Sequence, residues 1–162
     1  MKHLVFILFI LLILLTKLSH AQTATVYIGS LESDFGYGSL NEVGMQLIAS
    51  PNNLANVSIM EFDHKGNTYE GINISASLFI GGNLKAYSGI GGFFAKYDDC
   101  EMDFSKSEEE CTSVYTYGMY PELGVLFSFQ KLTLGAYGRY YKTFKDDSRE
   151  YSAYGFKIGY EI

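Results

Sequence analysis

The sequence predicts an all-β protein, an eight-stranded antiparallel up-and-down transmembrane β-barrel. Three observations predict this fold class. Eight segments alternate between apolar side chains and small or polar ones, Tyr, Phe and Gly are frequent, and the connections alternate between short and long. After the N-terminal region, no long segment has the 3.6-residue apolar period of an amphipathic helix. A chain that crosses lipid without apolar helices must close into a barrel to pair its backbone groups.

The N-terminal 21 residues predict a cleaved secretory signal. Lys2 and His3 precede a 12-residue apolar run from Leu4 to Leu15, and the small-residue site Ser19-His20-Ala21 follows. The run is short against the roughly 20 residues of a membrane-spanning helix. We therefore expect a signal at residues 1–21 and one barrel domain at residues 22–162. That domain has ten basic and 18 acidic residues, a net charge of −8, which does not suit nucleic-acid binding.

The first four alternating segments each place a set of apolar side chains on one face. The fourth is the clearest, because Ile72, Ile74, Ala76, Leu78 and Ile80 alternate with Gly, Asn, Ser and Phe. A slip of one residue would reverse its two faces. The corresponding sets in the first three segments are Val26 and Ile28; Val43, Met45, Leu47 and Ala49; and Ala55, Val57 and Ile59.

The last four segments carry more aromatic residues. The fifth, Leu84 to Tyr97, is ambiguous, because one set of apolar side chains (Leu84, Ala86, Ile90 and Phe94) competes with another (Tyr87, Phe93 and Tyr97). The sixth sets Tyr115, Tyr117, Met119, Leu123, Val125 and Phe127 against Tyr120, Glu122 and glycines. The seventh sets Leu132, Leu134, Ala136 and Tyr140 against Gly135, Tyr137, Arg139 and Tyr141. The eighth segment ends the chain.

The connections predict which end of the barrel faces which compartment. Pro51-Asn52-Asn53, Gly81-Gly82-Asn83 and Ser128 to Lys131 are turn-like, whereas longer polar stretches lie at residues 31–41, 63–67, 98–112 and 145–150. Three turns and four loops are what eight strands require, with the turns and both termini on the periplasmic side. The rival is a soluble lipocalin-like binding barrel. It is disfavoured because the non-apolar face is too poor in charge for the exterior of a soluble acidic protein.

The final segment resembles the last strand of a known family of barrels. Tyr154, Phe156, Ile158, Tyr160 and Ile162 alternate with Gly155, Lys157, Gly159 and Glu161. The chain thus resembles the small outer-membrane barrels of Gram-negative bacteria, the group that contains the OmpA transmembrane domain, OmpX and the opacity-like proteins. The resemblance implies that the five apolar residues are an assembly signal read by the barrel assembly machinery, although Ile162 stands where Phe is usual. It also implies a location in the outer membrane, among phospholipid and lipopolysaccharide, and we expect a monomer.

Four charges are expected to point into the barrel lumen. Glu122, Arg139, Lys157 and Glu161 all lie on the non-apolar faces of their segments. An isolated charge in a narrow barrel is costly, so these groups should pair. The resemblance implies a structural ion-pair network, and a charged constriction of a narrow solute or ion channel is the alternative. Eight strands leave an interior that side chains can fill, which disfavours a wide, porin-like pore.

The loop at residues 98–112 combines two cysteines with many acids. Cys100 and Cys111 bracket ten residues in a chain exported to an oxidising compartment, which predicts a disulfide. The CxxC spacing of a metal or redox pair is missing. Seven acids stand against the single base Lys106. They predict a solvated loop, with cation or basic-partner binding as the alternative, because their spacing matches no calcium loop.

Enzymatic function is not expected, and we predict no catalytic, cofactor or metal site. After the signal the chain has one histidine, His64, in a loop, and the His-x-Ser arrangement of lipid A deacylase barrels is absent. Six aromatic residues near segment ends are expected to form girdles at the two lipid interfaces. They are Tyr97, Tyr115, Phe127, Phe144, Tyr151 and Tyr160.

Overall fold

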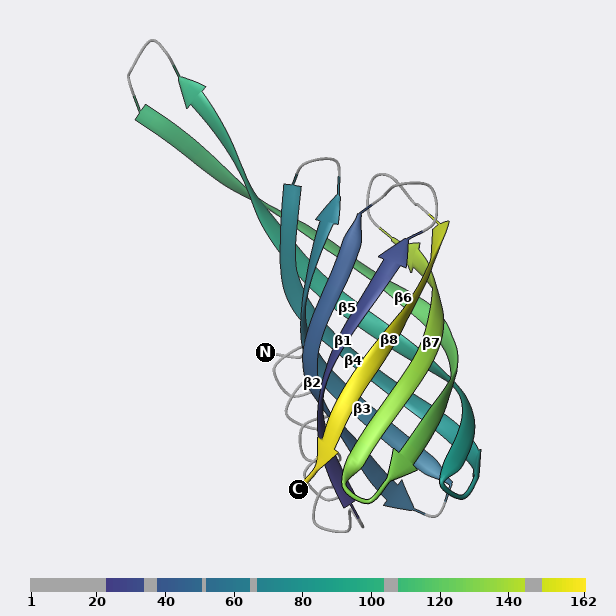
Figure 1. Ribbon diagram of the computed structural model, residues 1–162. Coiled ribbons are helices and arrows are strands. Elements are labelled where there is room, and N and C mark those ends of the chain that lie inside the picture. The colour runs from purple at the N-terminus through teal and green to yellow at the C-terminus, as the bar shows by residue number, and fades with distance from the viewer. Residues whose placement is uncertain (1–22, 34–37, 51, 65–66, 104–107, 145–149) are drawn as a thin grey trace, which may run out of the picture.

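The protein is a closed barrel of eight antiparallel strands (Figure 1). The computed structural model describes residues 23–33, 38–50, 52–64, 67–103, 108–144 and 150–162. Each strand pairs with the next in the sequence, and β8 pairs with β1, so the predicted up-and-down topology is confirmed. The strands are β1 (Thr23–Ser33), β2 (Ser39–Ser50), β3 (Asn53–His64), β4 (Asn67–Gly81), β5 (Leu84–Asp103), β6 (Glu108–Phe129), β7 (Leu132–Thr143) and β8 (Glu150–Glu161).

Apolar side chains cover the outside of the barrel, whereas the inside holds polar and charged side chains together with aromatic and apolar ones such as Leu31, Met60 and Phe79. Ile59, Leu78, Ile80 and Phe156 are 67–75% exposed, whereas Gln46, Asn56, Ser58, Asn73, Ser75 and Ser77 are buried. This is the reverse of a soluble barrel and matches a strand wall that faces lipid. The pattern therefore opposes the lipocalin-like alternative. Within the described residues there is also no helix that is long and apolar enough to span a membrane.

The ambiguous fifth segment is resolved by its partners. In β5, Tyr87 and Phe93 are buried, while Ile90 and Phe94 are about half exposed. Phe94 pairs with Ile72 on β4 and with Tyr117 on β6, both of which face outward. The sheet therefore assigns the aromatic set to the lumen, since paired residues share one face.

Tight turns close one end of the barrel. β4 ends at Gly81, whose φ of +113° is a left-handed conformation that glycine adopts without strain. β6 and β7 are joined through Gln130, which has a φ of 54°. The turns that the sequence predicts at Gly81–Asn83 and Ser128–Lys131 are confirmed in position. The third prediction includes Pro51, which lies outside the described residues, between the end of β2 at Ser50 and the start of β3 at Asn53.

Three of the four predicted loops at the other end, at residues 31–41, 63–67 and 98–112, are shorter than expected, because the strands continue into them. The largest correction concerns residues 98–112. β5 runs to Asp103 and β6 begins at Glu108, so most of the expected loop is a paired hairpin. Figure 1 shows this hairpin (teal to green) extending beyond the other strands. His64, also expected in a loop, is the last residue of β3.

Several sequence predictions lie outside what the structure describes. The expected signal at residues 1–21 is one of them. Cys100 and Cys111 face each other in the β5–β6 register, but their side chains are not among those described. The disulfide therefore stays a prediction.

Candidate functional site

The centre of the lumen is held by Arg139, which comes from β7. Its two terminal nitrogens donate hydrogen bonds to the two carboxylate oxygens of Glu42 on β2, each at 3.0 Å. Its Nε donates to Oε2 of Glu122 on β6 at 2.5 Å. All three side chains are at most 1% exposed. One guanidinium therefore bridges opposite walls of the barrel through its planar fork of donors.

Neutral donors complete the shell around Glu42. Ser58 Oγ and Asn73 Nδ2 donate to its Oε2 at 3.0 and 3.1 Å, and the Tyr137 hydroxyl donates to its Oε1 at 2.7 Å. Asn73 is in turn held by a hydrogen bond from the Tyr120 hydroxyl. A buried carboxylate is tolerated when its lone pairs are satisfied in this way, because charge pairing alone does not offset its desolvation.

Aromatic rings surround both buried cations. The Arg139 guanidinium lies 4.8 and 4.9 Å from the ring centres of Tyr120 and Tyr137. Lys157 Nζ lies 5.3, 4.9 and 5.0 Å from the ring centres of Tyr27, Tyr87 and Tyr137. Each ring presents its negative face to a cation, which stabilises a charge that has little water around it.

A glycine on β5 makes room for one of these rings. A Cβ added at Gly91 would lie 2.2 Å from the Tyr120 ring and 2.3 Å from its hydroxyl oxygen. Any side chain there would displace Tyr120 from Arg139 and Asn73. The alternation of large and small residues across the narrow lumen is what lets these side chains fill it.

Rings, most of them from neighbouring strands, also pack against one another inside the barrel, on the loop side of the charges. Phe62 stacks on Tyr69 at 4.6 Å, and Phe93 meets Tyr141 edge to face at 5.5 Å. Two residues expected in the lipid girdles belong here instead. Tyr97 lies 4.5 Å from Tyr69, and Tyr151 stacks on Tyr141 at 5.0 Å. The girdle prediction is wrong for these two residues. Side chains alternate between the two faces of a strand, and these two positions fall on the face that points into the barrel.

The four charges expected in the lumen have different places. Glu122 and Arg139 are in contact, and Lys157 is buried beside them among the tyrosines. Glu161 on β8 is only half-buried, and it lies opposite Thr25 on β1 in the register of the two strands. It lies four residues beyond Lys157, about 13 Å along the strand. Among the described residues, Glu161 forms no ion pair, and the structure does not bring it to Arg139.

Glu42 is the residue that the sequence reasoning missed. The predicted loop ends at residue 41 and the second apolar set begins at Val43, so Glu42 belongs to neither. Because side chains alternate along a strand, a segment that points Val43 and Met45 outward must point Glu42 inward. The sequence therefore contained the information needed to place Glu42 in the lumen. With Glu42 included, two carboxylates face two cations in the lumen, and their charges balance.

Four residues of the expected assembly signal lie on the outer face of β8, and the fifth, Ile162, directly follows the strand. Tyr154, Phe156, Ile158, Tyr160 and Ile162 are 44–75% exposed. They continue the apolar wall beside β1 and β7, with which β8 pairs. Their expected recognition by the assembly machinery remains a prediction.

Known structures share this architecture. The N-terminal barrel domain of Pseudomonas aeruginosa OprF matches with a TM-score of 0.68 at 10% identity, covering 88% of this chain and 98% of that one. Neisserial surface protein A matches at 0.59 and 13% identity, covering 86% and 95%. Yersinia pestis Ail, solved with the heparin analogue sucrose octasulfate, matches at 0.54 and 12% identity, covering 86% and 96%. No protein-family model and no curated protein matches the sequence.

The fold and the filled lumen define the class of protein. The chain has the fold of the small eight-stranded transmembrane β-barrels of the outer membrane, as its sequence resemblance implied. The similarity to outer-membrane barrels supports the same location for this protein. At these identities the likeness is one of fold.

Proposed function

We propose that this protein is an outer-membrane barrel that conducts no solute and acts at the cell surface through its β5–β6 hairpin. The observation that carries the proposal is the length of that hairpin. Its strands stay paired as far as Asp103 and Glu108, whereas β4 pairs with β5 only up to Lys96. On the other side, β6 pairs with β7 from Gly118 onward. The end of the hairpin is thus a two-stranded ribbon beyond the barrel wall (Figure 1).

The ribbon has two backbone edges that no neighbouring strand covers within the described residues. Edges of this kind can accept an extended segment of a partner as an additional strand. By sequence, residues 98–112 carry seven acids and one base, which favours a partner with basic side chains. A sulfated ligand such as the one in the Ail structure is negatively charged, like the hairpin itself, and is therefore disfavoured here.

The register of the hairpin also supports the predicted disulfide. Cys100 and Cys111 are directly opposite in an antiparallel pair, where Cα atoms are about 4.5–5.5 Å apart. This separation falls within the range that a disulfide spans. A bond there would hold the ribbon together in water, where a two-stranded hairpin is marginally stable by itself. Mass spectrometry of the unreduced protein, after proteolysis, tests for the linked peptides.

Replacing residues 98–113 with Asn-Gly tests the hairpin's role. This two-residue turn would connect Tyr97 with Val114, which face each other in the register. The probe is an oligolysine peptide, with sucrose octasulfate as the control of opposite charge. The full chain should bind oligolysine with an affinity that falls as salt rises, and the trimmed chain should not. Equal binding by the two chains would overturn the proposal.

The narrow channel remains the second candidate, because charged groups do lie in the lumen. We favour the closed lumen, since Glu42, Glu122, Arg139 and Lys157 are at most 5% exposed and are packed between rings. We also propose no catalytic role. Lipid A mass spectra that change when the gene is deleted, and recover with the intact protein but not with a His64→Ala variant, would contradict that part of the proposal.

A further inference from the structure

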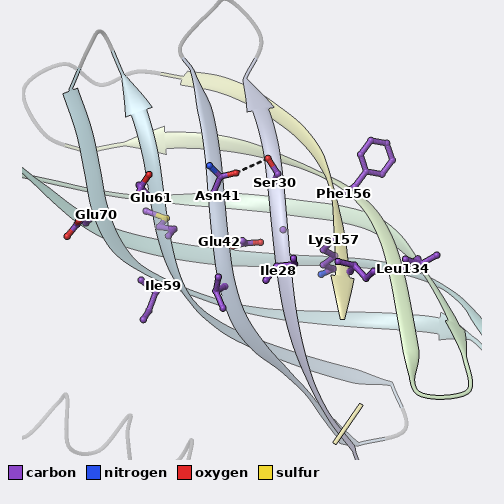
Figure 2. Close-up of a pocket in the computed structure, with 14 residues that line it drawn as sticks. Ile28, Ser30, Asn41, Glu42, Ile59, Glu61, Glu70, Leu134, Phe156 and Lys157 are labelled. Atoms are coloured by element: carbon purple, nitrogen blue, oxygen red, sulfur yellow. Dashed lines mark hydrogen bonds between the residues drawn. The ribbon is translucent and has the colours of Figure 1, made fainter. Parts of the chain in front are cut away.

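Two tyrosine rings meet at the point where the β5–β6 hairpin leaves the barrel wall. The pairing of β4 with β5 ends at Glu70 and Lys96. Tyr69 and Tyr97 are the next residues on these two strands. Glu70 is exposed and points away from the barrel (Figure 2), so its neighbour Tyr69 lies on the inward face, as Tyr97 does. The two rings therefore continue the contact between β4 and β5 where the backbone pairing stops.

The contact between Tyr69 and Tyr97 is close. Their ring centres are 4.5 Å apart, and the ring planes are tilted by 55°. This separation is at the short end of the roughly 4.5–7 Å that aromatic pairs adopt, so carbon atoms of the two rings touch. Tyr69 also stacks on Phe62 of β3, with ring centres 4.6 Å apart, which holds its ring in place beside Tyr97.

Exposure separates this pair from the other tyrosine contacts. Among the ring contacts within the described residues, two more join tyrosine to tyrosine, and both include Tyr141, which is 0% exposed. Tyr69 and Tyr97 are only half-buried, at the loop end of the barrel, where small solutes reach them. The chain has 14 tyrosines and no tryptophan, so the phenol is its most easily oxidised aromatic group. A solute that takes single electrons therefore meets this tyrosine contact first.

We propose that Tyr69 and Tyr97 form an oxidative cross-linking site, which a one-electron oxidant outside the cell converts to dityrosine. Each phenol gives one electron to an oxidant molecule and one proton to water, which leaves two neutral tyrosyl radicals in contact. The two unpaired electrons form a bond between ring carbons adjacent to the hydroxyl groups. Each of these carbons then transfers its hydrogen to its own ring oxygen, and both phenols are restored. Holding the rings in contact favours this reaction over coupling between separate chains.

The new bond would join β4 to β5 covalently at the base of the hairpin. It would fix the direction in which the two-stranded ribbon leaves the wall, because β4 is part of the closed barrel. The proposal rests on the proposed function in one respect, which is that the loop end faces outward. The coupling itself needs no partner at the hairpin. Failed oligolysine binding and a missing cross-link are therefore separate results.

The experiment treats the refolded full chain in detergent micelles with tris(bipyridine)ruthenium(III), which accepts one electron and needs no enzyme. The wild type should gain dityrosine fluorescence, and proteolysis should release two peptides joined through Tyr69 and Tyr97. Tyr97→Phe and Tyr69→Phe should each lose this cross-link and most of the fluorescence. Tyr115→Phe is the matched control, because Tyr115 is 43% exposed and stacks on Phe94 rather than on a tyrosine. It should couple like the wild type.

Gel mobility without boiling shows that each variant is folded before the oxidant is added. After boiling, the cross-linked wild type should run ahead of the untreated chain, because a closed loop makes the unfolded chain more compact. Three results would overturn the proposal. They are no dityrosine in the folded wild type, cross-links that join two chains instead of two residues of one chain, and equal yields from Tyr97→Phe and Tyr115→Phe.

Discussion

Replacing Arg139 with alanine would leave Glu42 and Glu122 buried without the cation they share. Arg139 gives three charge-assisted hydrogen bonds to these carboxylates and lies between two tyrosine rings. Removing one partner of a buried pair destabilises proteins by about 3–5 kcal/mol. Lys157 remains nearby and balances one of the two negative charges. We therefore expect the free energy of unfolding to fall by about 3–5 kcal/mol rather than by twice that amount.

The assay is urea unfolding of the refolded protein in detergent micelles, followed by far-UV circular dichroism and by gel mobility without boiling. A variant with all four lumen charges neutralised, Glu42→Gln, Glu122→Gln, Arg139→Gln and Lys157→Gln, should recover a large part of the lost stability, because no unpaired charge remains. A loss below about 1 kcal/mol for Arg139→Ala, typical of an exposed ion pair, would refute the reasoning.

Three further predictions concern the wall. Gly155→Ala should prevent folding, because its Cβ would lie 1.8 Å from a backbone oxygen of β1, whereas Gly82→Ala has nothing within 4 Å and should leave gel mobility unchanged. Ile158→Arg places a charge on the lipid face and should lower the free energy of unfolding by about 2–4 kcal/mol if it lies at the bilayer midplane. Lys142→Ala removes an exposed ion pair with Glu150 and should leave the urea midpoint unchanged.

The sequence was most informative where the membrane constrains it. Alternation predicted the outward faces of β4, β6, β7 and β8, and with them the inward positions of Glu122, Arg139 and Lys157. It could not predict that Arg139 reaches Glu42, 97 residues away, because that contact crosses the lumen and depends on the register of the closed barrel. Local spacing holds no information about which walls face each other.

The β5–β6 hairpin shows where alternation fails to predict a strand. Beyond the membrane both faces of a strand meet water, so no alternation of apolar and polar residues is required. The acidic run at residues 98–112 therefore resembled a solvated loop, although pairing continues through Cys100 and Cys111 to Asp103 and Glu108. Tyr97 and Tyr151 were misplaced for a related reason, because an aromatic residue near a strand end suits a girdle and a lumen equally well.

Single-channel recording in planar bilayers tests the central claim, a closed lumen inside a membrane barrel, most directly. The same refolded sample should shift in gel mobility on boiling, which confirms that the barrel has formed. We predict that the wild-type protein then gives no unitary conductance steps, because Arg139, Glu42, Glu122 and the surrounding rings fill the lumen. Reproducible conductance steps from folded wild-type protein, altered in Arg139→Ala, would contradict the account and assign these charges to a pore.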